Sequence, residues 1–208
     1  MIELLDNFSQ FLVTLFATIG GGLLFYKSRA QAHLLLTCVF ATFTLGTLYW
    51  TLHVLLFTYT PQVFYVSELA WIASEMFLLT LVLSLASPDE RNFRHPTMWL
   101  VPLFCIPQFI LYLFYGDILF NFLMCGLSMA VGWYSTRGLV YAKRQGGLRP
   151  LEVFHMVTLT IIFLKYCLWT SSCFWISDTY TNPYFWIDFL LTASYYALLP
   201  ATKKAVGL

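Results

Sequence analysis

Charged residues are scarce in this chain, and so are the features of soluble proteins. Of its 208 residues, 10% are charged and 60% are hydrophobic, whereas soluble domains carry about 25% charged residues. The net charge is +1, with no basic patch and no low-complexity tail, so we expect no nucleic-acid partner. The composition predicts one all-α membrane domain over residues 1–208, surrounded by the lipid bilayer.

Catalytic and metal-binding motifs are also missing. The five cysteines form no CxxC pair, and the sequence contains no HExxH, no GxSxG and no Cys/His metal spacing. We interpret the cysteines as small buried hydrophobic residues and expect neither a cofactor nor an enzyme. An enzyme acting on lipids or quinones is disfavoured because no polar cluster is predicted at the inner leaflet. The acidic start MIELLDNFSQ lacks the positive region of a signal peptide, so we expect the first apolar segment to be retained.

Long apolar segments fill the rest of the chain. Seven of them come close to the roughly 20 residues that cross a bilayer as a helix. They cover residues 5–26, 33–58, 63–86, 97–115, 118–141, 151–176 and 183–201. The fourth segment contains Pro102 and Pro107, so we expect it to be kinked or short.

The basic residues predict the orientation of these segments. Ten of the eleven Lys and Arg residues fall at alternate breaks between segments, which places them on one side of the membrane. Cytoplasmic loops carry an excess of Lys and Arg. The chain is therefore predicted to have its N-terminus outside, its C-terminus in the cytoplasm and seven transmembrane helices. The eleventh basic residue is Lys165.

Two stretches suggest an internal repeat. A Trp-Thr pair begins each stretch, at Trp50 and at Trp169, and a Thr-Tyr-Thr run, a proline and a Trp-Ile pair follow in both. A repeat would comprise residues 1–86 and 118–201 in the same orientation, joined by a linker helix at 97–115. Chance similarity in an aromatic-rich sequence is the alternative.

This 3+1+3 layout resembles that of the SWEET and PQ-loop transporter superfamily, which includes the PnuC-type vitamin transporters. Those families often carry Pro-Gln in the first helix of each repeat. Here Pro61-Gln62 precedes the third segment and Pro107-Gln108 lies in the fourth, so no residue role is transferred. The run TPQVFYVSELAWIASEMFLL also looks like small bacterial membrane proteins, a resemblance that implies no activity. We expect the protein to lie in a cell membrane, the bacterial cytoplasmic membrane.

Lys165 lies deep inside the sixth apolar segment, where a lone charge costs about 2.5–3.5 kcal/mol on insertion scales. It therefore needs a partner, water or a function. Glu75 is predicted to be that partner because its depth matches, and Asp188 is the second choice. Glu75 and Glu68 are seven residues apart and share a helix face.

Further polar and aromatic side chains are predicted to line a cavity that opens to the outside. Together with the charged residues, the candidate ligand-binding residues are Lys165, Glu75, Asp188, Glu68, His53, Trp50, Trp169, Tyr65 and Tyr195. The alternatives are a purely structural Lys165–Glu75 pair, a Glu68 that reaches the membrane interface, and a His53 that only bonds a neighbouring helix.

We expect a small-solute transporter or facilitator with a charged site near the membrane midplane. Protonation of Glu75 or Asp188 would couple it to a proton gradient. The alternative is a non-enzymatic seven-helix sensor or accessory subunit whose basic inner loops contact a cytoplasmic partner. A homo-oligomer is compatible with either function.

Overall fold

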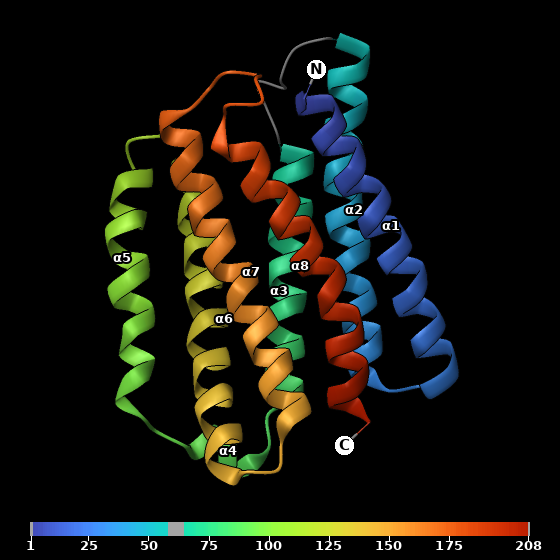
Figure 1. The fold of residues 1–208 in the computed structure, drawn as a ribbon, viewed down its shortest axis with the longest axis vertical. Helices are drawn as coiled ribbons and strands as arrows, with labels where there is room; N and C mark the ends of the chain where they lie inside the picture. The colour runs from blue at the N-terminus through green and yellow to red at the C-terminus, as the bar shows by residue number, and fades with distance from the viewer. Residues whose placement is uncertain (1, 58–64, 208) are drawn as a thin grey trace.

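The computed structural model describes residues 2–57 and 65–207, with Tyr65 described by its backbone alone. These residues form helices and contain no strand, which confirms the all-α prediction for the described chain. The helices are α1 (Ile2–Ser28), α2 (Gln31–Phe57), α3 (Tyr65–Leu85), α4 (Pro88–Asn92), the 3-10 helix η1 (Pro96–Trp99), α5 (Leu100–Tyr112), α6 (Ile118–Gln145), α7 (Arg149–Phe174) and α8 (Pro183–Val206) (Figure 1).

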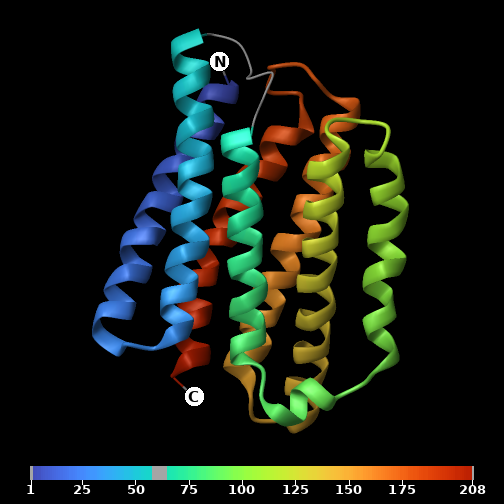
Figure 2. The same cartoon turned by 180° about the vertical axis from the view of Figure 1, so that it is seen from behind.

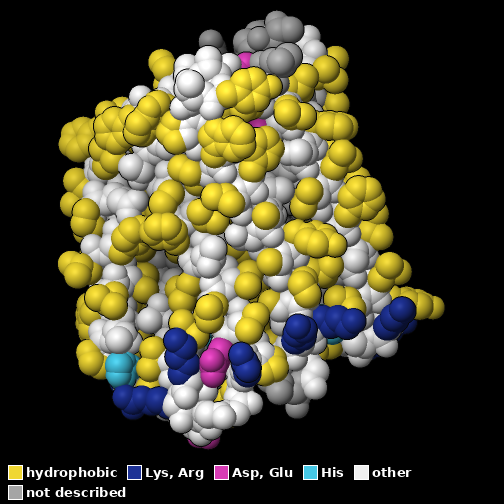
Figure 3. Space-filling view, in the orientation of Figure 1, with side chains coloured by type: hydrophobic (Ala, Val, Ile, Leu, Met, Phe, Trp, Pro, Cys, Tyr) yellow, Lys and Arg dark blue, Asp and Glu magenta, His cyan; other side chains and the backbone are white. Residues whose placement is uncertain are grey.

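Among the described residues, five helices are long and apolar enough to cross a membrane, namely α1, α2, α3, α6 and α7. Residues Pro96–Tyr112 form a shorter apolar helix. Hydrophobic side chains are spread over the face in Figure 3. Soluble proteins rarely expose so large an apolar area to water. These helices support a protein embedded in a membrane through several of its helices, and the count of seven stays a prediction.

Local signals explain where several helices begin and end. Asp117 caps α6 by accepting a hydrogen bond from the backbone N–H of Phe120 at 2.9 Å. Asn182 caps α8, and Pro183 follows at the first helical position, where a missing N–H costs nothing. The expected short fourth segment is confirmed, because α5 has 13 residues and carries Pro107 in its interior.

Six helices form a closed ring. Each packs against its neighbour in the order α1, α2, α3, α6, α7 and α8, and α8 closes the ring on α1. Helix α5 lies outside this ring against α6 and α7, as the two opposite views show (Figures 1 and 2). The N-terminus lies at one end of the bundle, here called the upper end, and the C-terminus and α4 lie at the other, lower end (Figure 1).

The lower half of the ring contains a core of apolar side chains, together with buried polar ones such as His33, His155 and Thr202. Fully buried residues there come from four helices: Leu36, Val39 and Phe40 in α2, Leu78 and Leu81 in α3, Phe154 and Ile161 in α7, and Leu198 in α8. In a membrane such packing stabilises helix association through van der Waals contact. The upper half is packed differently, because a cavity lies there.

Candidate functional site

A cavity of about 410 Å³ occupies the upper half of the ring. Its lining residues come from α1, α2, α3, α5, α6, α7 and α8, and the lining reaches Tyr115, Gly116 and Asp117 in the loop after α5. That loop is at the upper end, so the cavity extends from the middle of the bundle to this end. The volume lies within the range of small-molecule pockets, about 300–1,000 Å³.

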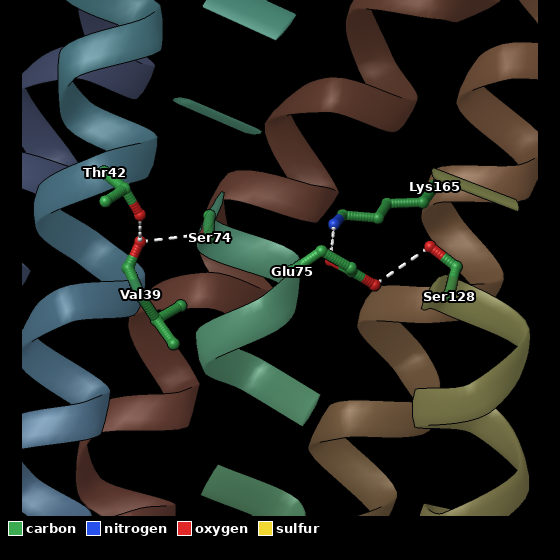
Figure 4. A network of polar contacts seen from close by, with 6 residues as sticks. All are labelled: Val39, Thr42, Ser74, Glu75, Ser128 and Lys165. Carbon is green, nitrogen blue, oxygen red and sulfur yellow. Dashed lines mark hydrogen bonds and ion pairs between the residues drawn. The ribbon is translucent and has the colours of Figure 1, made fainter. Parts of the chain in front are cut away.

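Lys165 lies at the inner limit of the cavity and forms an ion pair with Glu75. The ammonium group of Lys165 donates to Oε2 of Glu75, and Oε1 of Glu75 accepts from the hydroxyl of Ser128 at 2.9 Å (Figure 4). Lys165 is 4% exposed and Glu75 is fully buried. The prediction that Glu75 rather than Asp188 pairs with Lys165 is therefore confirmed.

Helix α3 holds this pair between two sides of the ring. The residue before Glu75, Ser74, points the other way and donates to the carbonyl oxygen of Val39 in α2 at 2.9 Å (Figure 4). Successive residues on a helix point about 100° apart. One turn of α3 therefore bonds α2 on one side, and α6 and α7 on the other, through Ser128 and Lys165.

Four other predicted site residues line the cavity above this pair: Glu68, Asp188, Trp50 and Trp169. Asp188 is 5% exposed, and its Oδ1 accepts from Nε2 of Gln10 at 2.7 Å. The indole N–H of Trp50 donates to Glu3 at 3.4 Å. The predicted grouping of these side chains around one cavity agrees with their positions in the structure.

The three remaining predicted site residues are Tyr195, His53 and Tyr65, and they are not among the described residues that line the cavity. Tyr195 is buried beneath Lys165, whose Nζ lies 5.6 Å from the centroid of its ring. His53 contacts the rings of Tyr49 and Phe57, at centroid distances of 6.1 and 4.8 Å, and is not among the described residues that line the cavity. The side chain of Tyr65 lies outside the described residues.

The placement of His53 corrects the sequence prediction and has a geometric reason. His53 lies three positions after Trp50, so its side chain points about 60° away from that of Trp50 around the helix. Tyr49, His53 and Phe57 are spaced by four and form their own stripe on α2. Trp50 therefore faces the cavity while His53 joins the neighbouring stripe.

Sequence reasoning missed the contribution of α1. Asp6 is 1% exposed and interacts with the carboxyl group of Asp188, and Asn7 and Gln10 line the cavity. Within the described chain neither carboxylate oxygen of Asp6 accepts a hydrogen bond. A spacing of four from Asp6 to Gln10 to Thr14, all buried, marks one inward helix face and could have revealed them.

The aromatic walls were also only partly predicted. Besides Trp50 and Trp169, the cavity is lined by Phe43, Trp71, Tyr112 and Tyr184. The lining thus combines aromatic surface with a few charged and amide side chains, a composition typical of sites that bind small molecules. Within the described residues, no group of three or more His, Cys, Asp or Glu side chains is placed to hold a metal ion.

The functional interpretation is based on the geometry of the site. Comparison of the chain with models of known protein families, with curated proteins and with solved structures finds no match.

Proposed function

We propose that the protein is a small-solute transporter or facilitator, and that the solute binds in the cavity above Lys165 and Glu75. The observation that carries this proposal is a cavity with charged walls halfway through a bundle of apolar helices. Ionisable residues inside a membrane are costly, and they commonly mark the path of a substrate or ion.

In the proposed arrangement all seven apolar segments, the short α5 included, cross a bacterial cytoplasmic membrane, with the upper end outside. The distribution of basic residues supports this orientation. The Lys and Arg side chains visible in Figure 3 gather near the lower end, and cytoplasmic ends of membrane proteins are enriched in these residues. The cavity then opens to the outside, as its lining in the loop after α5 requires.

The order of helices in the ring supports the proposed repeat. Helices α1, α2 and α3 form one consecutive row, and α6, α7 and α8 form another. The contact of α3 with α6 is matched by that of α8 with α1, as a two-fold axis along the bundle would produce. Helix α5 is the linker outside both rows. Transporters built from such parallel repeats alternate access by moving one repeat against the other.

The Lys165–Glu75 pair is placed to control such a movement. It joins α7 of one row to α3 of the other, and Ser128 of α6 extends the link. Below it the ring is closed by tightly packed, buried side chains, most of them apolar. Solute binding or protonation that weakens the pair would loosen the contact between the rows and open the lower half.

Purified protein in liposomes tests this proposal. We expect uptake of one class in a panel of small cationic, neutral and anionic solutes, and we expect Glu75→Gln and Lys165→Met to reduce it at least about tenfold by removing a contact at the site. Thr160→Val is the matched control, because Thr160 lies on α7 but is exposed on the outer surface. Unchanged uptake in both site variants would refute the proposal.

One observation favours a second function, a ligand sensor or accessory subunit. The closed lower half leaves the cavity open at one end only, and a sensor needs no second opening. Its basic lower end would contact a cytoplasmic partner. Absence of flux by the pure protein, together with co-purification of a cytoplasmic protein that Lys143→Ala and Arg144→Ala abolish, would favour this function over transport.

A further inference from the structure

The charges around the cavity are unequal. Four charged residues line it: Glu68, Asp117, Lys165 and Asp188. Lys165 is the single cation among these lining residues, and its charge is balanced by Glu75 directly beneath it. The carboxyl groups of Glu68 and Asp188 therefore face the cavity with no further cation among its lining residues, even when Asp117, which caps α6, is left aside.

Asp6 adds to this excess from behind the wall. It lies against Asp188 and is almost fully buried, and its carboxylate oxygens accept no hydrogen bond within the described chain. The carboxylate of Asp188 accepts a hydrogen bond from the neutral amide of Gln10. Two adjacent buried carboxyl groups need a shared proton or a nearby cation to be stable. The cavity surface beside Asp188 is where such a cation has access.

Aromatic rings face the same space from opposite sides. The rings of Trp50 and Trp71 lie 5.9 Å apart between centroids, and those of Tyr112 and Trp169 lie 6.0 Å apart. Tyr184 completes the wall next to Asp188. Aromatic faces attract ammonium groups within about 6 Å, and Trp does so most strongly. Carboxylates combined with aromatic walls form the recognition pattern of an organic cation.

We propose that the cavity binds a small organic cation, a protonated amine or quaternary ammonium compound, with its charged group beside Asp188 and its carbon groups against the indole rings. This inference rests on the proposed binding site and adds the class of its ligand. An anion would find Lys165 already paired, and a neutral polyol would bring no positive charge to the carboxyl groups of Glu68 and Asp188.

Cys173 provides a native probe for this proposal, because it lines the cavity and is partly accessible. The cysteines Cys38 and Cys167 are replaced by alanine, and the protein is treated with trimethylammonioethyl methanethiosulfonate or with its anionic counterpart, sulfonatoethyl methanethiosulfonate. Labelling of Cys173 is followed by peptide mass spectrometry. The ratio of the two rates is divided by the same ratio for free mercaptoethanol, which cancels the intrinsic reactivities of the reagents.

The expected normalised ratio favours the cationic reagent by about tenfold or more, since a cleft lined by one sign of charge concentrates the opposite ion by 10- to 1,000-fold. Its rate should also saturate with concentration, as binding before reaction requires. Glu68→Gln and Asp188→Asn should lower the ratio. Asp89→Asn, which removes an exposed carboxylate at the lower end, should not.

A normalised ratio near one, or faster labelling by the anionic reagent, would overturn the cation site. Because Glu68→Gln changes a residue at the cavity wall, it serves as the test variant even if Asp188→Asn fails to fold. The experiment distinguishes failure of the proposed ligand class from failure of the proposed transport function. Absence of a cationic preference overturns the ligand class whether or not flux occurs, whereas a cationic preference without flux overturns transport alone.

Discussion

The buried pair of Lys165 and Glu75 allows a quantitative test of how the ring is held together. Lys165→Met leaves the buried carboxylate of Glu75 with the Ser128 hydroxyl but no cation, and Glu75→Gln leaves a buried ammonium group without its counter-charge. Removing one partner of a buried ion pair costs about 3–5 kcal/mol, whereas replacing both is often close to neutral. The double variant should therefore be more stable than either single variant.

The expected shift in melting temperature follows from the size of the chain. For a domain of 150–250 residues, 1 kcal/mol corresponds to about 2–4 °C, so each single variant should melt roughly 6–20 °C below the wild type. The double variant should recover most of this loss, which corresponds to a coupling energy of about 2 kcal/mol or more. Thermal unfolding in detergent, followed by circular dichroism, measures all four proteins.

Thr160→Val on the outer surface of α7 is the control and should leave the melting temperature unchanged. Additive effects would contradict the reasoning. If the double variant loses the sum of the two single losses, the ion pair does not couple α3 to α7, and the proposed control of the lower half loses its basis.

Three further variants test other parts of the structure. Gly138→Ala should cost about 1–3 kcal/mol of stability by overpacking, because its new Cβ would come within 2.1 Å of the His155 ring. Gly126→Ala on the same helix is the control and should be neutral or stabilising, because its Cβ would meet nothing within 4 Å. Equal melting temperatures of the two variants would contradict the close packing at Gly138. Burial raises the pKa of Glu90 above its usual value of 4.5, although the neighbouring arginines oppose this shift. The folded state therefore holds the proton of Glu90 more tightly than the unfolded state does. Stability should fall as the pH rises from about 4.5 through the raised pKa. The gain in melting temperature from Glu90→Gln should therefore be larger at pH 8 than at pH 5, and a pH-independent gain would contradict it. Asp6→Asn should raise the melting temperature, because the new amide can donate a hydrogen bond to the carboxylate of Asp188. A lower melting temperature would show that the second carboxylate is needed.

The sequence by itself determined the helices and the depth of their polar residues. Apolar length and the polar breaks predicted where α1, α2, α3, α5, α6, α7 and α8 lie, but not the short α4, and the prolines predicted a short α5. The pairing of Lys165 with Glu75 could be predicted because both lie at the same depth and a buried charge needs a counter-charge. These conclusions depend on position along the helix axis, which residue number reports directly.

Only the tertiary structure decided which helix faces meet. Periodicity indicates that Asp6 and Gln10 share a face, but the packing of α1 against α8 places that face beside Asp188. Packing likewise turns Trp50 into the cavity and leaves His53 on an adjacent stripe. The rotation of a helix about its axis depends on side-chain contacts from several distant segments, and in a chain this rich in apolar residues no single segment specifies it.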